Sequence, residues 1–500
     1  MVEIGTGKSV ILCHSCQNYP HTLFLTKVRP MSQLRKCSVV FLSISVLALI
    51  ICVPSRLSQA AGTSESAPLQ VATFECDITP PIGSPLCYGH VAPAKKVVDP
   101  LSARGIVILG SEKPIVMLAL DWVGANNGAQ DVWKKKLAEA LDTTTDRCAV
   151  HCLHQHDAPG VDISANARLK QQNLNGIMYN EDYLNDVMQR TIQAARASLK
   201  TAQPVTHVGT GKGTVKQFAS NRRILGPDGK VKIVRYSSSR NPAAIAAPVG
   251  TIDPFVRLLS LWNKDQPIVI LSYYATHPQS YYGKGGISCD TVGLARALHE
   301  KQTPGVLHVH FNGAGGNIGA GKFNNGDPEN RPLLAQRLAD GMKQAWDTTE
   351  KTPISSGDVN WKSKPVLLPL RDTLDETKLT GILENPKARL TDRIRAARDL
   401  DYLKRTQAGT TIDITRLKLG PAQVVHMPGE LFVEYQLAAQ KMAPHDFVCM
   451  AAYGDQGPGY IGTTIAYAQG GYETSRVSRT APEVETVLMQ TLKELVTNNY

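Results

Sequence analysis

Six apolar runs along the chain predict buried β-strands. Aliphatic residues dominate each run without regular polar alternation, which is typical of strands covered on both faces of a sheet. Most runs end in a polar residue close to glycine or proline, so a loop is expected after each strand. The six runs are GIVILG (105–110), PIVMLALDWV (114–123), CAVHCLHQH (148–156), PIVILSYYATH (267–277), GVLHVHFNGAG (305–315) and AQVVHMPGE (422–430).

Helical patterns separate these runs. Apolar residues recur at helical spacing over four segments: 129–142, 181–199, 432–443 and 480–497. Strands that alternate with helices predict an α/β fold, with a mixed β-sheet core, flanking helices and the polar strand ends gathered on one edge. We find no sign of a second domain and expect a single large domain over residues 70–500.

One segment, residues 372–407, differs from the rest of this domain. Lys, Arg, Asp, Glu and Leu dominate it at helical spacing. The pattern predicts a helical insertion or a surface hairpin, and its charges are more typical of a solvated face than of a binding patch.

The longest apolar stretch, residues 38–53, lies near the start of the chain. A membrane span needs about twenty residues, so this stretch is short for one. Arg35 and Lys36 precede it, and the small residues Ala60 and Ala61 follow it. A positive start, an apolar middle and a small-residue exit indicate a secretory signal peptide.

The signal-peptide pattern predicts how the first part of the chain is organised. Met31 is expected to be the true start, so that residues 1–30 are a mispredicted extension and residues 31–61 are the signal peptide. Residues 62–69 are small and polar, which predicts a flexible tether. The protein is then secreted, periplasmic or on the cell surface, and the alternative is an uncleaved membrane anchor.

Composition and charge narrow the class of protein. The 500 residues include 42% hydrophobic and 19% charged residues, 40 Gly and 30 Pro, which describes a globular chain with a sizeable core. The net charge is +11, but only +6 remains from residue 61 onward, without a basic block. We therefore expect no nucleic-acid partner. The sequence has no G-x-S-x-G motif, which argues against an α/β-hydrolase triad.

The sharpest cluster of chemistry-bearing residues is His154-Gln155-His156, at the end of a predicted strand. Residues two apart in an extended segment point to the same side, so both imidazoles can face one cavity. A rigidly held neutral imidazole is a preferred zinc ligand. The alternative is a pair of histidines in a polar loop, because this spacing also recurs by chance.

Three more polar residues lie where a strand-like run meets a Gly/Pro loop: His277, Glu430 and Tyr460. Each has an ordinary alternative, respectively a hydrogen-bonded surface histidine, a solvated carboxylate in a turn and a half-buried aromatic ring. Their joint placement favours a site, because open α/β sheets bind ligands at the carboxyl ends of their strands. Two histidines, a carboxylate and one more oxygen donor would hold zinc and still admit water and substrate.

A glycine-rich loop, residues 311–319, follows another predicted strand but lacks the lysine of a phosphate-binding loop. We expect its backbone to approach neighbouring segments closely and to line a pocket. Asn312 or Asn317 would offer hydrogen-bond donors there, and the loop around Asn317 is the candidate to stabilise an oxyanion.

At these residues the sequence resembles the neutral/alkaline (non-lysosomal) ceramidase family, over nearly all of residues 70–500. The matching segments follow the order expected for the N-terminal catalytic domain of that family. The ordered set is more specific for the family than any single segment. The segments are DITPPIG (77–83), HQHDAPG (154–160), NRR (221–223), ATH (275–277), PGE (428–430) and GYIGT (459–463).

The resemblance implies a catalytic zinc site. It assigns the zinc to four ligands: His154, His277, Glu430 and Tyr460. It gives His156 a role in contacting the substrate and transferring a proton, and it matches Arg222 and Tyr472 to positions that line the substrate site. With Asn317, these residues form the predicted site.

The sequence also departs from the family in three places. The loop Gly313-Ala314-Gly315-Gly316-Asn317 lacks the serine that ceramidases carry there, and Asp157-Ala158 stands in place of their Ser-Gly. The chain also has no room for their C-terminal immunoglobulin-like domain. These departures leave ceramide itself open as a substrate.

We therefore expect a secreted, zinc-dependent hydrolase of an amide bond, such as that of an N-acyl lipid. The alternatives are an ester, lactone or glycan-derived amide as the substrate, or a non-catalytic, zinc-containing binding protein of the cell surface. The expected partner is a small-molecule or lipid substrate, with association with a membrane surface as an option. The sequence predicts no oligomeric state.

Overall fold

The computed structural model describes residues 68–110 and 112–497. The predictions for the extension, the signal peptide and most of the tether fall on residues 1–67 and lie outside the described residues. Within the described residues no helix is long and apolar enough to cross a membrane.

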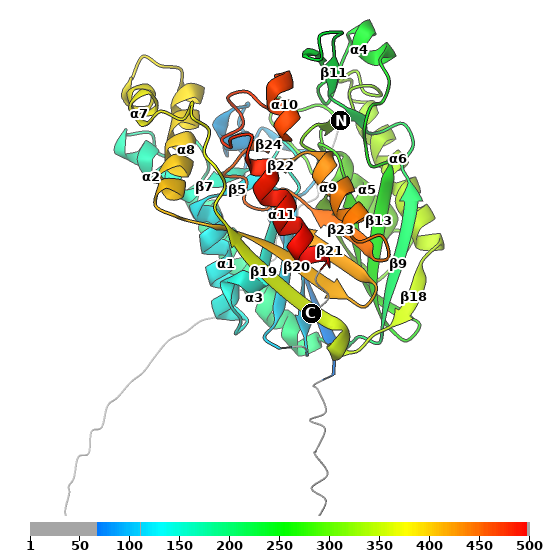
Figure 1. Ribbon diagram of the computed structural model, residues 1–500. Coiled ribbons are helices and arrows are strands. Elements are labelled where there is room, and N and C mark those ends of the chain that lie inside the picture. Colours follow the sequence, from blue (N-terminus) through cyan, green and yellow to red (C-terminus); the bar gives the residue numbers. More distant parts are fainter. Residues whose placement is uncertain (1–67, 111, 498–500) are drawn as a thin grey trace, which may run out of the picture. The chain divides into compact units, whose positions relative to one another are not determined.

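Three mixed β-sheets form the framework of the domain (Figure 1). The first, in spatial order, contains β6 (Cys148–Cys152), β4 (Ile115–Leu120), β3 (Ser102–Leu109), β1 (Gln70–Asp77) and β8 (Gln203–Pro204). The second contains β16 (Leu307–Asn312), β14 (Gln266–Tyr274), β13 (Phe255–Asn263), β9 (His207–Thr214) and β18 (Glu350–Pro353). The third contains β19 (Val359–Val366), β20 (Ile412–Leu419), β21 (Ala422–His426) and β23 (Phe447–Ala451).

Each sheet combines antiparallel strands with one parallel pair. The parallel pairs are β4 with β6, β14 with β16, and β21 with β23. These pairs contain five of the six predicted apolar runs, because parallel strands are buried on both faces. The α/β class with a mixed sheet core is confirmed, although the polar strand ends belong to three sheets and not to one.

The inner faces of the three sheets share one hydrophobic core. In β4, Ile115, Met117 and Ala119 point into this shared core, while Val116 and Leu118 point outward. The same period of two places Val269 and Leu271 of β14, and Val424 of β21, on the shared core. The three sheets therefore pack against one another as well as against helices.

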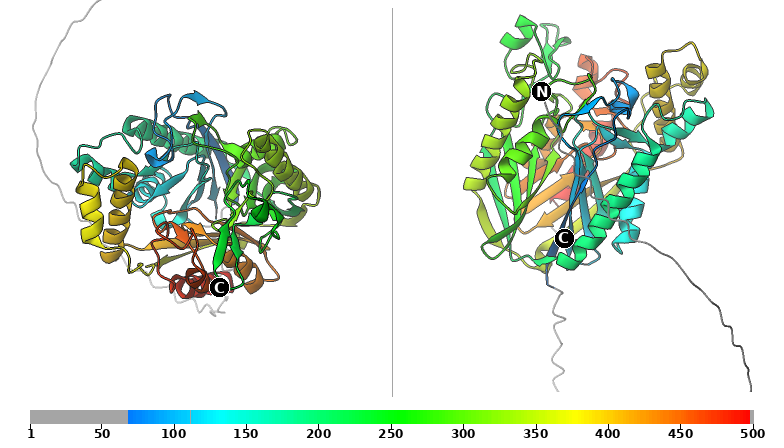
Figure 2. Two further views of the ribbon diagram at one scale, coloured as in Figure 1. Left: turned by 90° about the horizontal axis from the view of Figure 1, so that it is seen from above. Right: turned by 180° about the vertical axis from the view of Figure 1, so that it is seen from behind.

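Helices cover the outer face of each sheet (Figure 2). The first sheet packs against α1 (Gly128–Ala140) and α3 (Glu181–Ser198), and the second against α5 (Asp290–Glu300) and α6 (Asn330–Asp347). The third packs against α9 (Val433–Met442) and α11 (Val484–Thr497). Four of these helices, α1, α3, α9 and α11, lie in the segments with helical spacing.

The segment 372–407 contains two helices, α7 (Glu376–Glu384) and α8 (Leu390–Gln407). The helix α8 packs against α7 and against α2 (Ile163–Gln171). About half of its residues are buried, so α8 is an integral part of the fold and not only a solvated face.

Candidate functional site

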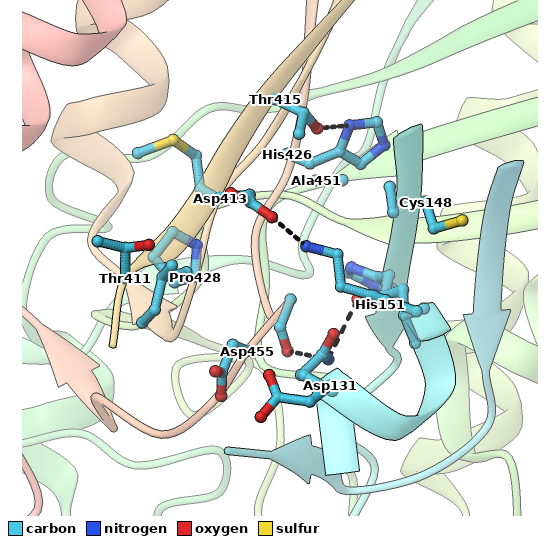
Figure 3. Close-up of a pocket in the computed structure, with 17 residues that line it drawn as sticks. Asp131, Cys148, His151, Thr411, Asp413, Thr415, His426, Pro428, Ala451 and Asp455 are labelled. Carbon is cyan, nitrogen blue, oxygen red and sulfur yellow. Dashed lines mark hydrogen bonds and ion pairs between the residues drawn. The ribbon is translucent and has the colours of Figure 1, made fainter. Parts of the chain in front are cut away.

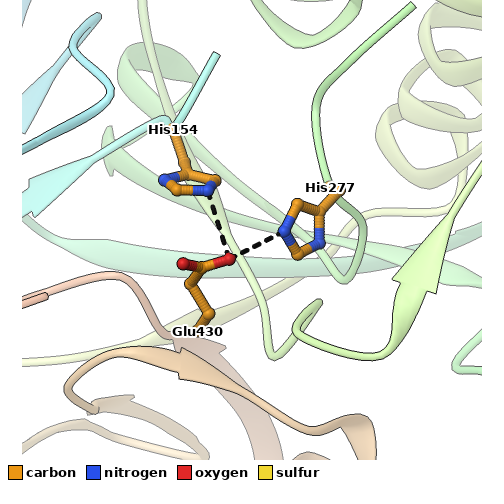
Figure 4. A group of neighbouring side chains, drawn as sticks. All are labelled: His154, His277 and Glu430. Carbon is orange, nitrogen blue, oxygen red and sulfur yellow. Dashed lines mark hydrogen bonds and ion pairs between the residues drawn. The ribbon is translucent and has the colours of Figure 1, made fainter. Parts of the chain in front are cut away.

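The three sheets each deliver one side chain to a single point (Figure 4). His154 follows β6, His277 follows β14 and Glu430 follows β21, and we call these three side chains the His–Glu group. The Nε2 atoms of His154 and His277 lie 3.3 and 2.9 Å from the same carboxylate oxygen, Oε2 of Glu430. The two imidazole rings are 5.3 Å apart between centroids. Three ligand atoms that share one zinc at bonds of about 2 Å lie at similar separations.

The second nitrogen of each imidazole is bound to a backbone carbonyl. Nδ1 of His154 lies 2.8 Å from the oxygen of Val123, and Nδ1 of His277 lies 2.6 Å from the oxygen of Gly315. A carbonyl oxygen only accepts, so each Nδ1 carries a proton. In a neutral ring Nε2 then presents a lone pair, and both lone pairs face Glu430. This arrangement is the one that a metal ligand needs.

Burial and charge set the ionisation of the His–Glu group. Burial lowers the pKa of His277 below its ordinary value, although Glu430 acts in the opposite direction. Burial would raise the pKa of Glu430, but His154 and His277 hold it well below its usual range through charge and hydrogen bonds when Nε2 carries a proton, the place that a bound cation would take. Two nitrogen lone pairs and a carboxylate oxygen in one buried place favour a cation among them.

Tyr460 stands beside this group because two Pro-Gly turns pair with each other. The short strands β22 (Glu430–Leu431) and β24 (Tyr460–Ile461) are parallel, with Glu430 opposite Tyr460. Gly429 and Gly459 precede them with φ of 66° and 68°, a conformation that favours glycine. The Tyr460 hydroxyl lies 3.1 Å from Nε2 of His277.

The glycine loop holds two of the ligand-bearing segments together. A Cβ on Gly315 would lie 2.6 Å from the backbone carbonyl carbon of Thr276. A Cβ on Gly316 would lie 2.1 Å from the backbone carbonyl oxygen of Glu430. Gly316 N also donates to Leu431 O at 2.7 Å. The expected close approach of this loop is therefore observed, and its partners are the segments that carry His277 and Glu430.

His156 lies next to the His–Glu group, but not for the expected reason. His154 has φ of 64°, so the segment is not extended there and strand alternation does not orient the pair. The two rings are nevertheless 5.1 Å apart, and His156 lies 4.5 Å from the Tyr282 ring. Nδ1 of His156 is buried and has no hydrogen-bond partner among the residues that the structure describes, and burial lowers the pKa of the ring well below its ordinary value.

Arg222 and Tyr472 also lie beside the His–Glu group. Nη1 of Arg222 donates to the Tyr460 hydroxyl at 3.2 Å and lies 3.4 Å from Nε2 of His277. The Arg222 guanidinium contacts three tyrosine rings, those of Tyr236, Tyr460 and Tyr472, at 5.4 to 5.8 Å from their centroids. Tyr472 is 36% exposed and marks the outer edge of this cluster.

Asn317 has a different environment from the other predicted site residues. Its Oδ1 accepts from the Val433 nitrogen at 2.9 Å, and its Nδ2 donates to Glu434 at 2.9 Å. Both groups of this side chain thus have partners at the start of α9. These bonds give Asn317 a positioning role, and its donation to an oxyanion stays a prediction.

Two pockets lie at this site, and the first of them is lined by members of the His–Glu group. One, of about 150 Å³, is lined by His154, Glu430 and four arginines, Arg395, Arg398, Arg476 and Arg479, and we call it the arginine pocket. The other, of about 390 Å³, is lined by serine and tyrosine residues with Gln279 and Lys284. His156, Tyr460 and Tyr472 line both. Sequence reasoning missed the arginines: nothing in the pattern of α8 separates Arg395 and Arg398 from solvated ones, and Arg476 and Arg479 lie in a later segment without a helix.

A smaller cavity of about 80 Å³ lies elsewhere, between β6 and the third sheet (Figure 3). Two of its charged groups pair with each other, because Lys134 binds Asp413 at 2.7 Å. His426 is bound by Thr415 at 3.2 Å. None of the predicted site residues lines this cavity.

Comparison with known proteins identifies the fold. No protein-family model matches the sequence, and no curated protein matches it. A solved ceramidase complexed with C2 superposes with a TM-score of 0.63 at 16% identity, over 86% of this chain and 75% of the other. The neutral ceramidase from Pseudomonas aeruginosa gives a TM-score of 0.63 at 17% identity, over 87% and 74%. The chain shares the fold of these ceramidases, as the sequence resemblance implies.

Proposed function

We propose that this protein is a zinc-dependent hydrolase that cleaves an amide bond in an N-acyl compound. The observation that carries the proposal is the His–Glu group, in which two Nε2 lone pairs and an ionised carboxylate meet at 2.9 and 3.3 Å. The ceramidase fold supports the reaction class, since a ceramidase hydrolyses an amide.

The residues of the group fit zinc in number and kind. His154, His277 and Glu430 offer two nitrogens and one oxygen, and the Tyr460 hydroxyl offers a fourth donor. Zinc bound by such ligands supplies Lewis acidity toward a carbonyl oxygen and toward water. The carbonyls of Val123 and Gly315 orient the two imidazoles and increase their basicity.

The proton transfers of amide hydrolysis are assigned to His156. Its Nδ1 is buried without a partner and the ring lies beside both pockets, so it can accept a proton from water and return it to the leaving amine. Arg222 keeps the Tyr460 hydroxyl in place through its hydrogen bond and contacts Tyr472 at the substrate side. We further propose that the protein acts outside the cytoplasm, on the strength of the signal-peptide pattern.

The test combines metal analysis with turnover. Purified wild-type protein should bind about one zinc per chain and hydrolyse a panel of N-acyl amides and of esters. His154→Ala removes a ligand and should lower both zinc affinity and kcat/KM by at least 100-fold, more than the 10- to 100-fold typical of residues behind a ligand. His445→Ala, at an exposed position, is the matched control and should change neither.

The outcomes separate the alternatives. Zinc without metal-dependent turnover over the whole panel would favour a non-catalytic binding protein. Turnover of esters but not amides would keep the metal site and correct the substrate. A protein that takes up no zinc would overturn the proposal.

A further inference from the structure

The arginine pocket has a surplus of positive charge. Of its four arginines, Arg479 is neutralised, because it donates to Asp399 at 2.6 Å and to Gly457 O at 2.8 Å. Arg476 is exposed and has no ion pair or hydrogen bond within residues 68–110 and 112–497. Glu430 is the single carboxylate that lines the pocket, and it faces the two histidines.

The two arginines from α8 are also without a carboxylate of their own. Arg395 approaches Asp392 only to 3.9 Å, and Asp392 is already bound by Arg389 at 2.7 and 3.2 Å. Arg398 lies 3.7 Å from the centroid of the Tyr88 ring, and its buried Nε has no hydrogen-bond partner in the described part of the chain. Burial and the neighbouring Arg476 lower the pKa of Arg395, as expected where like charges converge.

The fold holds these side chains in place. Residues three apart on a helix share a face, so Arg395 and Arg398 point to the same pocket from α8. The residues between and beside them, Ala396, Ala397 and Asp399, are buried in the domain. Arg395 and Arg398 are thus held by a fixed helix, whereas Arg476 reaches the pocket from an exposed turn.

The lining of both pockets combines polar groups with tyrosine rings and has few aliphatic side chains. Val123 and Val477 are the aliphatic side chains of the arginine pocket, and the larger pocket has none. A guanidinium binds carboxylate, sulfate and phosphate groups through paired hydrogen bonds. A concave site of one charge sign also concentrates ligands of the opposite sign.

We infer that the substrate carries an anionic group, a carboxylate, sulfate ester or phosphate ester, that binds Arg395, Arg398 and Arg476 while its scissile bond lies at the His–Glu group. This inference rests on the proposed hydrolase function for the position of the scissile bond. The substrate is then a polar, anionic N-acyl compound and not a neutral ceramide.

The first test measures binding and does not depend on turnover. Inorganic sulfate, inorganic phosphate and succinate are titrated calorimetrically into zinc-loaded protein at constant ionic strength. The double variant Arg395→Gln/Arg398→Gln should weaken binding of the preferred anion at least tenfold. The control Lys404→Gln/Arg405→Gln removes two charges from the same helix, where they pair with Glu376 and Asp131, and should bind as the wild type does.

The second test uses turnover of a matched pair of substrates. The 4-nitroanilide of succinic acid carries a carboxylate, and its methyl ester is the neutral counterpart. Wild-type kcat/KM should favour the anionic member at least tenfold, and the pocket variant should lose this preference. Turnover of both members without preference would overturn the anionic substrate and leave the hydrolase standing.

The binding test and the turnover test distinguish failure of this inference from failure of the proposed function. Anion binding that depends on Arg395 and Arg398, without any turnover, would support the pocket and contradict the hydrolase. Equal loss of binding in the pocket variant and in the helix control would show only a general charge effect and would overturn the inference, as would a wild type that binds none of the three anions.

Discussion

The His–Glu group and the arginine pocket adjoin each other but differ in how their charges are balanced. In the group, each Nδ1 meets a carbonyl and each Nε2 meets Glu430, so a cation is what completes it. In the pocket, Arg395, Arg398 and Arg476 have no carboxylate of the described residues within hydrogen-bonding distance, so an anion is what completes it. The His–Glu group therefore lacks a positive charge, and the arginine pocket lacks a negative one. A metal ion would supply the first and a substrate the second.

The two regions also come from different parts of the fold. The group is built from strand ends of three sheets that share a core, which fixes its geometry from three sides. The pocket is built from α8 and from the loop around Arg476, which lie outside the three sheets. Under the proposed function, the sheets would supply the reaction chemistry and α8 would supply the choice of substrate.

After the loss of a ligand itself, the largest expected effect comes from a change that disturbs the group and leaves the pocket alone. Gly316→Ala places a Cβ 2.1 Å from the backbone oxygen of Glu430, so the carboxylate must shift. We expect zinc affinity to fall 10- to 100-fold, as when a residue that orients a ligand is lost. Competition with a chelator measures it, and circular dichroism checks that the variant is folded.

The control for this prediction is a glycine with free space around it. A Cβ on Gly381, in α7, would meet nothing within 4 Å. Gly381→Ala should keep wild-type zinc affinity and gain roughly 0.5–1 kcal/mol of stability. A folded Gly316→Ala protein with wild-type affinity would contradict the role of the glycine loop.

A smaller effect is expected from Tyr460→Phe, which removes one of the four proposed zinc ligands and leaves three. The hydroxyl lies 3.1 Å from His277 Nε2 and accepts from Arg222 at 3.2 Å, so the variant also removes one hydrogen bond of Arg222, which keeps its ion pair with Glu473. We expect zinc affinity to fall by about tenfold, at the lower end of the range for residues that support a metal site. Unchanged affinity with lower kcat would instead make Tyr460 a substrate-side residue and not a ligand.

The strands that lead to the group are predictable from the sequence, because burial on both faces gives unbroken apolar runs. The strand β9 is less visible, since Gly209, Gly211 and Gly213 alternate along it and glycine is rare in strands. The structure supplies the reason: a Cβ on Gly211 would lie 1.9 Å from the oxygen of Ala345 in α6. This close packing of α6 on β9 is a tertiary contact. In the local sequence it leaves only alternating glycines, which do not predict a strand.

The site is predictable in its ligands but not in its surroundings. His154, His277, Glu430 and Tyr460 each stand at a strand end or a Pro-Gly turn, and the structure brings all four together. That their strands belong to three sheets depends on pairing between distant residues, which no local pattern encodes. Similarly, Arg395 and Arg405 look alike in sequence, and only tertiary contacts separate a pocket residue from one that pairs with Asp131.

The smallest expected effect concerns a carboxylate behind the pocket, and it contrasts with Glu430. Asp162 caps α2 through the Ala165 nitrogen at 3.1 Å and is fully buried. Burial and the neighbouring Asp401 raise its pKa to about 7, although Arg398 acts against them. The carboxyl therefore binds a proton more tightly in the folded chain than in the unfolded one.

This raised pKa sets the sign of a pH effect on stability. The folded state holds more protons than the unfolded state between about pH 4 and 7, so this group's contribution falls by about 1.4 kcal/mol per pH unit at most as the pH rises through that window. Asp162→Asn keeps a capping oxygen and should flatten the pH dependence of the free energy of unfolding, measured with urea at pH 5 and pH 7.5. The wild type and the variant differ at this group alone. The comparison is therefore between their changes in the free energy of unfolding from pH 5 to pH 7.5, and not between their absolute stabilities. Equal changes in both proteins would mean that Asp162 is ionised at neutral pH in the folded protein. The carboxylate behind the arginine pocket would then be charged, as Glu430 is in the His–Glu group.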